Sequence, residues 1–482
     1  MTNPALPAPA LPGYDRTRLT PGIVHIGLGN FHRAHQAVYL DDLFTLGLDH
    51  DWAILGAGVR ANDAAMRAAL AAQDYLSTVI ELAPGAPRAR RIGAMTGFIS
   101  VEPDNATLIA AMARPEIRIV SLTVTEGGYF IDASKGAFDA SHPEILADAA
   151  APETPATAFG AILAALRLRR VAGLMPFTVM SCDNLPGNGH VTKATTVGLA
   201  RLSDPAFADW VAANVAFPNG MVDRITPATG PNERALAARF GLADPVPVTC
   251  EPFRQWVLED NFPAGRPALE KVGVTFTEDV HDYETMKIRI LNGGHAIIAY
   301  PSALMDIVLV DKAMANPLIC AFLEKLEREE ILPHVPPVPD TDLNDYLALI
   351  IDRFSNPEIA DTTRRLFLDG SNRQPKFIVP SLRDTLAAGN LPHGLILLSA
   401  LWCRYCYGLT DSGVTIAAND PDWDQLQARA HTARENPGTW LTMSHIYGDL
   451  AADPKVVTAF SASLNAIWAE GVETTLRRYL AR

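Results

Sequence analysis

A strand, a glycine turn and a helix follow one another near the N-terminus, and no other stretch constrains the fold as strongly. Residues 22–27 have the composition of a buried strand, Gly27-Leu28-Gly29 forms the turn, and residues 36–44 have a helical pattern. Glycines let backbone N–H groups approach a pyrophosphate, and a helix N-terminus adds a positive partial charge. This succession predicts a Rossmann-like dinucleotide-binding unit.

The turn departs from the full glycine fingerprint at one position. His32 stands where the third glycine of G-x-G-x-x-G is expected. A G-x-G pair alone also occurs in ordinary turns, so the motif by itself leaves both interpretations open. The neighbouring Arg33 could add a cation for a phosphate, or it could be a surface charge at a helix start.

A second strand candidate, residues 52–58, precedes Asp63 and an alanine-rich helical stretch, residues 64–72. In NAD enzymes an acidic residue after the second strand binds the hydroxyls of the adenosine ribose. Asp63 lies 34 residues after Gly29, whereas the usual separation is about 20, so the intervening loop must be long. Alternatively, Asp63 only caps the helix that follows it.

Polar loops follow several strand candidates. Residues 117–124 lead into Thr-Glu126-Gly-Gly, residues 177–182 lead into the loop 183–190, and residues 217–227 form another loop with adjacent opposite charges. The remaining strand candidates are residues 75–82 and 247–250. Because ligand crevices of α/β sheets form outside the carboxyl ends of strands, Glu126 is a candidate site residue; otherwise it belongs to a simple turn.

Beyond about residue 279, helical patterns replace strands. The predicted helices cover residues 283–300, 312–330, 341–354, 357–368, 378–388, 393–408, 421–433 and 454–481. Residues 370–377 are expected to form a basic loop. The change of pattern predicts an α/β Rossmann-like domain in residues 1–280 and a mostly α-helical domain in residues 281–482.

A lysine, an asparagine and a histidine interrupt an apolar segment at the start of the second region. At about 100° per residue, Asn292 lies about 140° round a helix from Lys287, and His295 about 80°. The three side chains can then enter one cleft, where the lysine is a plausible general base with an amide and an imidazole beside it. The alternative is a lysine packed along apolar surface, a C-cap asparagine and a hydrogen-bonded core histidine.

Composition argues against several classes of protein. A net charge of −14 without a basic run argues against nucleic-acid binding. No run reaches the ~18 apolar residues that cross a bilayer, and residues 1–13 lack the regions of a secretory signal. Five scattered cysteines favour a reducing compartment, so we expect a cytoplasmic protein. Cys403 and Cys406 have C-x-x-C spacing without a second pair and are expected to be buried thiols.

Five stretches occur together in one order along the chain. They are residues 26–35, 120–128, 178–189 and 217–227, and the spacing Lys287-x4-Asn292-x2-His295. In this order they resemble the long-chain mannitol dehydrogenase family of polyol-specific dehydrogenases. The resemblance runs from about residue 20 to residue 480. It implies an NAD-dependent, zinc-independent oxidoreductase, with NAD on the Rossmann-like domain and much of the substrate site on the helical domain.

The resemblance also implies roles for individual residues. The catalytic set would be Lys287 as general acid/base, Asn184 and Asn292 at the reacting oxygen, and Glu126 in proton exchange with solvent. Polyol hydroxyls would be bound by Asp223, His295, Arg365 and Arg373, the last of which is often lysine in relatives. The cofactor would be bound by Gly27, Gly29, Phe31, Arg33 and Asp63, with Asp63 favouring NAD over NADP.

These roles agree with the chemistry of alcohol oxidation. Without zinc, two amide N–H donors can stabilise an alkoxide-like oxygen, as in an oxyanion hole. Partial burial and a positive nicotinamide nearby would lower the pKa of Lys287 from about 10.4. The hydride acceptor must lie about 3–4 Å from the carbon that is oxidised.

The substrate is harder to assign than the reaction. The Leu-Pro in the loop 183–189 is similar to mannitol-specific members, so the expected reaction interconverts D-mannitol and D-fructose. Arabinitol or sorbitol dehydrogenases and fructuronate reductases of the same family are alternatives, because few hydroxyl contacts set the substrate. A non-catalytic NAD-binding regulatory protein is a remoter alternative. The family is often monomeric, and no heptad pattern argues otherwise.

Overall fold

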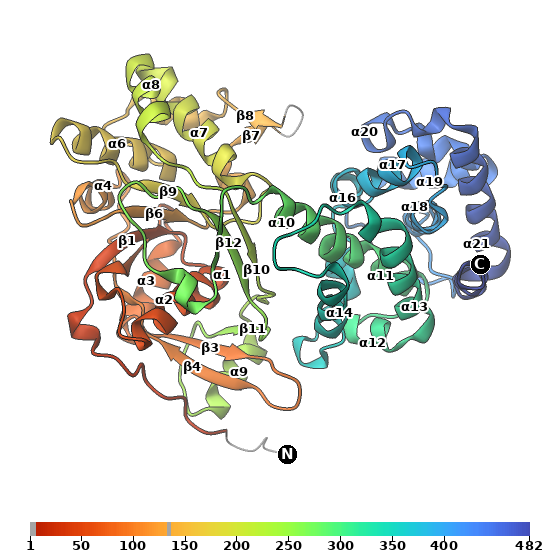
Figure 1. The fold of residues 1–482 in the computed structure, drawn as a ribbon, viewed down its shortest axis with the longest axis horizontal. Coiled ribbons are helices and arrows are strands. Elements are labelled where there is room, and N and C mark those ends of the chain that lie inside the picture. The colour runs from red at the N-terminus through yellow and green to blue at the C-terminus, as the bar shows by residue number, and fades with distance from the viewer. Residues whose placement is uncertain (1–5, 133–135) are drawn as a thin grey trace. The chain divides into compact units, whose positions relative to one another are not determined.

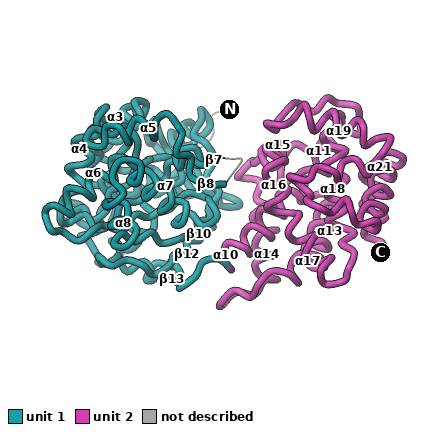
Figure 2. Tube along the Cα trace, turned by 90° about the horizontal axis from the view of Figure 1, so that it is seen from above, with its two compact units in different colours: residues 1–281 teal, residues 282–482 magenta. Residues whose placement is uncertain are grey.

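The computed structural model describes residues 6–132 and 136–482. The chain divides into two compact units, Met1–His281 and Asp282–Arg482 (Figure 2). The first unit mixes strands and helices, whereas the described secondary structure of the second is helical apart from isolated bridges. The predicted fold class, a Rossmann-like α/β part and a mostly α-helical part, is confirmed.

A five-stranded parallel sheet organises the first unit. In spatial order its strands are β5 (Met95–Phe98), β2 (Ala53–Ala57), β1 (Pro21–Ile26), β6 (Ile119–Leu122) and β9 (Thr178–Ser181). All neighbouring strands run parallel. The chain order reverses at β1, which has β2 on one side and β6 on the other. In such sheets the ligand crevice lies outside the carboxyl ends of the strands at this point.

Alternate residues of the central strands enter two separate hydrophobic cores. Val24 and Val120 belong to one core, whereas Ile23 and Ile119 belong to the other. Successive strand side chains point to opposite faces, so both faces of the sheet are covered. This explains why the strands are apolar along their whole length and why the sequence reveals them.

Helices cover the sheet on both faces. The helices of the first unit are α1 (Asn30–Ala34), α2 (Gln36–Thr45), α3 (Asp63–Ala71), α4 (Ala106–Ala113), α5 (Pro143–Ala150), α6 (Ala158–Val171), α7 (Asn188–Ser203), α8 (Pro205–Asn214) and α9 (Pro231–Arg239). Short 3-10 helices are η1 (Arg16–Arg18), η2 (His50–Trp52), η3 (Glu126–Tyr129) and η4 (Leu269–Val272). Figure 1 shows α6, α7 and α8 together near β9, and α7 packs against both helices and this strand.

Three smaller sheets complete the first unit. One contains β11 (Val248–Cys250), β3 (Ser77–Glu81) and β4 (Arg88–Ile92); the second contains β10 (Gly220–Asp223), β12 (Gln255–Glu259) and β13 (Thr275–Thr277); the third pairs β7 (Ile131–Asp132) with β8 (Ala137–Phe138). The prediction that residues 217–227 are entirely loop was wrong, because β10 lies within them. This strand depends on antiparallel pairing with β12, a non-local contact that local sequence does not report.

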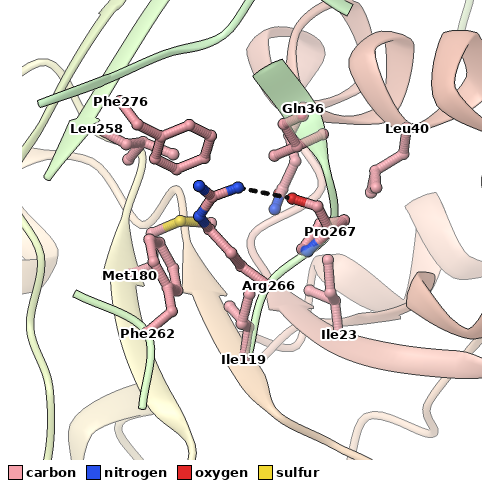
Figure 3. Close-up of a pocket in the computed structure, with 11 residues that line it drawn as sticks. Ile23, Gln36, Leu40, Ile119, Met180, Leu258, Phe262, Arg266, Pro267 and Phe276 are labelled. Carbon is pink, nitrogen blue, oxygen red and sulfur yellow. Dashed lines mark hydrogen bonds between the residues drawn. The ribbon is translucent and has the colours of Figure 1, made fainter. Parts of the chain in front are cut away.

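A small hollow lies between the main sheet and the segment 262–276 (Figure 3). Apolar side chains line most of it, and the Arg266 guanidinium lies 3.4 Å from the ring centroid of Phe276. Arg266 also pairs with Asp260 and Glu270 at 2.7 Å each. The open volume of the hollow is about 10 Å³, whereas ligand pockets span about 300–1,000 Å³. This hollow is a packing space and not a cofactor site.

The second unit is built from helices. They are α10 (His281–Met286, which begins one residue earlier), η5 (Lys287–Asn292), α11 (Gly293–Leu304), α12 (Val310–Ala315), α13 (Pro317–Leu326), η6 (Glu327–Ile331), η7 (Leu332–His334), α14 (Leu343–Phe354), η8 (Pro357–Ile359), α15 (Thr363–Leu366), α16 (Gly370–Phe377), α17 (Val379–Ala387), α18 (His393–Cys406), α19 (Trp423–Glu435), η9 (Pro437–Thr442), α20 (Ser444–Tyr447), η10 (Leu450–Ala452) and α21 (Pro454–Leu480). The central helix, α18, packs against α11, α13, α19 and α21. Cys403 and Cys406 are buried thiols within it, as expected.

Four predictions about these helices need correction. The expected single helix 312–330 is interrupted, because Asn316 has an extended backbone and caps the start of α13. The expected basic loop at 370–377 is the helix α16, whose glycine start and internal proline concealed it. The expected helix 357–368 is only the short η8 and α15. The expected continuous helix 454–481 is kinked at Gly471, which has φ +78°. A second helical segment starts after it, and Asp411 accepts a hydrogen bond from Val472 N at that start.

Gly27, at the end of β1, gives a direct test of the sheet edge. Its φ is +99°, and an added Cβ would stand 2.1 Å from the Thr123 carbonyl oxygen. Gly27→Ala should lower the free energy of unfolding by about 1–3 kcal/mol, because the left-handed conformation and the backbone clash both disfavour a side chain. Chemical denaturation of both proteins measures this difference.

Gly29→Ala is the matched control for this prediction. Gly29 has φ −72°, and no atom lies within 4 Å of an added Cβ. Its stability should match that of the wild type. Equal stability losses in the two variants would contradict the role assigned to Gly27.

Candidate active site

The glycine turn after β1 is anchored to both neighbouring strands. Gly27 donates its N–H to the Ala57 carbonyl at 3.0 Å, and its own carbonyl accepts from the Thr123 hydroxyl. Nε2 of His25 lies 3.1 Å from the same carbonyl oxygen and 2.9 Å from Thr123 Oγ1. The turn therefore has a defined shape before any ligand binds.

Two stacked histidines support the turn from inside. The rings of His25 and His32 are 3.5 Å apart, both residues are buried, and His25 Nδ1 lies 2.7 Å from Ser121 Oγ. Burial lowers the pKa of His25 to about 3, and burial together with nearby positive groups lowers the pKa of His32 well below its usual value. Both rings are neutral near pH 7. His32, which replaces the third glycine, is thus a packing residue.

Arg33 also supports the turn from inside. It is fully buried, so the alternative of a surface charge is wrong. Its guanidinium contacts the Gly29 carbonyl at 3.3 Å and Asn30 Oδ1 at 2.8 Å, and it donates to the Val246 carbonyl. Burial lowers its pKa to about 10, so it remains a cation. Phe31, beside it, stacks on His35 with centroids 4.7 Å apart.

The residues at this edge fit a dinucleotide. Gly29 is exposed, and the space where a Cβ would stand is open, so a phosphate could approach its backbone. Asp63 lies just past the carboxyl end of β2 as the first residue of α3, and its Oδ2 accepts from Arg60 N at 2.9 Å. This bond orders the loop before the helix; Asn62, not Asp63, is the N-cap residue.

Glu126 and Asn184 lie at the carboxyl ends of adjacent strands. Glu126 begins η3 after β6, and Asn184 follows β9; both are exposed. The carboxylate of Asp183 joins the two loops, since it accepts from Val124 N at 2.9 Å and Thr125 N at 3.1 Å. Asp183 was not among the predicted site residues; a carboxylate directly after a buried strand was the available signal.

Asp223 ends β10 and is buried. The next residue, Arg224, is fully buried and donates to the carbonyls of Ala34 at 2.6 Å and Glu251 at 3.0 Å. It also pairs with Glu81 at 2.7 Å. These bonds fix the strand end that carries Asp223.

In the second unit, the segment with Lys287 is a π-helix. The i→i+5 bonds of a π-helix place residues five apart about one turn from each other, and Lys287 and Asn292 are the first and last residues of η5. The angle of about 140° expected for an α-helix was therefore wrong, and the two side chains lie closer to one side. Lys287 is buried, with 6% of its surface exposed.

His295 marks where the polar residues of this unit gather. Its ring stacks on Phe354 with centroids 4.7 Å apart. Its pKa is held well below the usual value, first by burial and then by the positive charges of four residues. These are Arg365, Arg353, Arg373 and Lys287. Three of the four were predicted site residues, so the structure places them close to His295.

Two of the three arginines around His295, Arg365 and Arg373, make hydrogen bonds to other groups. Arg365, on α15, pairs with Asp361 through Nε at 2.7 Å and a second contact. Arg373, on α16, donates to the Leu366 carbonyl at 2.9 Å. Both contacts restrict the side chains.

A buried glutamate beside this segment was missed. Glu327 opens the second π-helix, is fully buried, and neither carboxyl oxygen has a hydrogen-bond partner among the described residues. Its Oε1 lies 3.5 Å from where a Cβ of Gly294 would stand. Burial raises its pKa well above the usual value. No local pattern separates it from the charged run around it.

A hollow in the second unit lies elsewhere. It has a volume of about 590 Å³ and lies between the two limbs of α21 and the start of α18. None of the predicted site residues lines it. In the part of the chain that the structure describes, no group of three His, Cys, Asp or Glu residues could hold a metal ion, and no helix is long and apolar enough to cross a membrane.

A five-stranded parallel sheet with an anchored glycine turn defines the Rossmann class of dinucleotide-binding folds. The family model of the mannitol dehydrogenase Rossmann domain matches residues 21–271, and that of the mannitol dehydrogenase C-terminal domain matches residues 279–468. The chain belongs to the mannitol dehydrogenase family, as the resemblance implied.

Relatives with known names cover nearly the whole chain. Mannitol 2-dehydrogenase of Cereibacter sphaeroides is 74% identical over 98% of both chains, and that of Aspergillus fumigatus is 40% identical over 98% of this chain and 95% of its own. Among solved structures, the Pseudomonas fluorescens mannitol 2-dehydrogenase complex with NAD and D-mannitol matches with TM-score 0.85 and 43% identity, covering 99% and 98%. A substrate-free D-sorbitol dehydrogenase matches with TM-score 0.91 and 34% identity, covering 98% of both.

Glu327 makes stability depend on pH in a defined direction. Because burial raises its pKa in the folded protein, the folded state keeps a proton that the unfolded state loses above about pH 4.3. Stability should therefore fall as pH rises, by up to about 1.4 kcal/mol per pH unit. Glu327→Gln removes this titration, so its advantage in Tm over the wild type should grow from pH 5 to pH 8.

Glu329→Gln is the control, because Glu329 lies on the same π-helix but its side chain is 61% exposed. Its difference from the wild type should stay constant with pH. Calorimetry at several pH values measures all three proteins. A pH-independent difference for Glu327→Gln would contradict the buried, protonated carboxyl.

Proposed function

We propose that this protein is an NAD-dependent, zinc-independent oxidoreductase that interconverts D-mannitol and D-fructose. The observation that carries the proposal is 74% identity to a mannitol 2-dehydrogenase over 98% of both chains. The glycine turn, the two asparagines and the buried lysine supply the groups that the reaction needs.

NAD, when bound, accepts the hydride from the carbinol carbon. Residues 1–280 form the cofactor domain of this proposal. The open backbone at Gly29 would receive the pyrophosphate, Gly27 shapes the turn, and Asp63 would accept hydrogen bonds from the adenosine ribose. Arg33 and Phe31 would act on the cofactor indirectly, by supporting the turn, since Arg33 is buried beneath it.

Residues 281–482 form the substrate domain of this proposal. Lys287 takes the hydroxyl proton, and the amide N–H groups of Asn292 and Asn184 stabilise the oxygen that gains negative charge. Glu126 passes the proton on to solvent, which its exposure favours.

Polyol recognition needs fixed donors and acceptors for several hydroxyls. Arg365 and Arg373 are each held by a protein contact, and the low pKa of His295 keeps its ring neutral, so that it can donate and accept. Asp223, on a strand end fixed by Arg224, supplies a carboxylate. The proposal also includes a cytoplasmic location and a monomeric state. The five free cysteines support the reducing compartment.

A second candidate substrate is sorbitol. The observation that favours it is the TM-score of 0.91 with a D-sorbitol dehydrogenase, although the identity is lower, at 34%. Arabinitol and fructuronate are further alternatives in the same class of reaction, because a few hydroxyl contacts set substrate preference.

A substrate panel tests the proposal. Absorbance at 340 nm is followed with NADH and fructose or fructuronate, and with NAD and mannitol, sorbitol or arabinitol. We expect the highest kcat/KM for mannitol and fructose, and preference for NADH over NADPH. Higher kcat/KM with fructuronate would overturn the substrate, a preference for NADPH would overturn the role of Asp63, and no turnover of any pair would support a non-catalytic protein.

Lys287→Ala tests the general base. It should lower kcat by about 10²- to 10⁴-fold in both directions, while the Kd for NADH, measured by fluorescence titration, stays near the wild-type value. Lys312→Ala is the control, because the Lys312 side chain is 65% exposed and pairs with Asp311. Near-native kcat in Lys287→Ala would show that another group moves the proton.

A further inference from the structure

The Asp183 carboxylate accepts three hydrogen bonds. Oδ2 accepts from Val124 N at 2.9 Å and from the Tyr129 hydroxyl at 2.7 Å, and Oδ1 accepts from Thr125 N at 3.1 Å. All three donors belong to the segment after β6, whereas Asp183 belongs to the segment after β9. One side chain therefore fastens two strand ends together.

The segment that Asp183 holds is strained next to Glu126. Thr125 has φ +64° and ψ 165°, a conformation that costs a non-glycine residue about 1–3 kcal/mol. Such a conformation persists only when the surroundings impose it, and the Thr125 N–H bond to Asp183 is one of the contacts that do so. Without it, the backbone carrying Glu126 is free to relax.

Asp183 is itself fixed by further hydrogen bonds. The buried Tyr129 hydroxyl also lies 2.6 Å from Ser181 Oγ, and Ser181 Oγ accepts from Asp183 N at 3.3 Å. Asn188 donates to the Asp183 carbonyl at 3.1 Å and to the Gly220 carbonyl at 2.8 Å. The main chain of Asp183 is thus fixed directly before Asn184.

We infer that Asp183 is a positioning residue for the reaction, which keeps Glu126 and Asn184 in a fixed relation to each other. The inference rests on the proposed function, in which these two residues serve the proton and the reacting oxygen. Asp183 lies inside the loop and acts through its neighbours. A displacement of about 1 Å at either neighbour can cost on the order of 100-fold in rate.

Asp183→Asn is the main variant, because its amide keeps one oxygen acceptor but turns an NH2 group towards a donor. We expect kcat for mannitol to fall about 10- to 100-fold, while the Kd for NADH and the KM for mannitol stay within about twofold, since the loss is in the chemical step.

Asp148→Asn is a matched control with the same chemistry elsewhere. Asp148 is buried and accepts from Ala156 N at 2.8 Å, Thr157 N at 3.0 Å and the Thr157 hydroxyl at 2.6 Å. It therefore also has two backbone donors and one hydroxyl, but it holds the start of α6. Both variants should lose similar stability, and only Asp183→Asn should lose kcat. Equal kcat losses would overturn the inference.

Double-mutant cycles show whether Asp183 acts through its neighbours. Combined with Asn184→Ala or with Glu126→Gln, Asp183→Asn should add much less than its separate effect in at least one cycle, because coupled residues are not additive. Fully multiplicative losses in both cycles would overturn the inference.

Tyr129→Phe decides the matter if Asp183→Asn does not fold. It removes one of the three bonds, so kcat should fall several-fold with unchanged NADH binding; unchanged kcat would overturn the inference. The wild type separates the two levels of the argument. If the wild type does not oxidise mannitol, the proposed function is wrong. If the wild type oxidises mannitol and the variants have the same kcat, only the role of Asp183 is wrong.

Discussion

The close approach of Gly27 to the Thr123 backbone is the constraint on which the first unit depends. Only a residue without a Cβ can sit there, since an added Cβ would lie 2.1 Å from the Thr123 carbonyl oxygen. The contact brings the carboxyl ends of β1 and β6 together at the point where the strand order reverses. The open backbone at Gly29, the Asp63 loop and the segment carrying Glu126 all belong to this edge of one sheet.

Three buried titratable groups, two in the first unit and one in the second, are neutral. His25, His32 and Glu327 are all buried, and burial shifts each pKa towards the uncharged form. An uncharged group avoids most of the cost of leaving water. Three charged groups, Arg33, Arg224 and Asp183, differ from these neutral groups because each has several hydrogen-bond partners. At these three residues, hydrogen bonds compensate for the buried charge.

The second unit uses irregular helices where the chemistry is expected. Two π-helices, Lys287–Asn292 and Glu327–Ile331, are in contact with each other, and the residues whose charges act on His295 gather nearby. π-helical turns occur frequently at functional sites, because the extra residue per turn redirects side chains. Here the π-helix places Lys287 and Asn292 closer together round the helix than the regular α-helix expected from the sequence would.

The sequence by itself determined the fold class, the six strands named from their apolar runs, and the family, because buried parallel strands and the glycine turn leave local patterns. It also indicated the candidate residues, although their roles came from the resemblance and remain predictions. Only the tertiary structure decided that β10 is a strand, that residues 370–377 are helical, that Arg33 points inward and that Asp183 joins two loops. The strand β10, the inward Arg33 and the Asp183 contacts depend on partners far along the chain, and a non-local contact leaves no periodic signal in the residues that make it. The helix at 370–377 was concealed instead by its glycine start and internal proline.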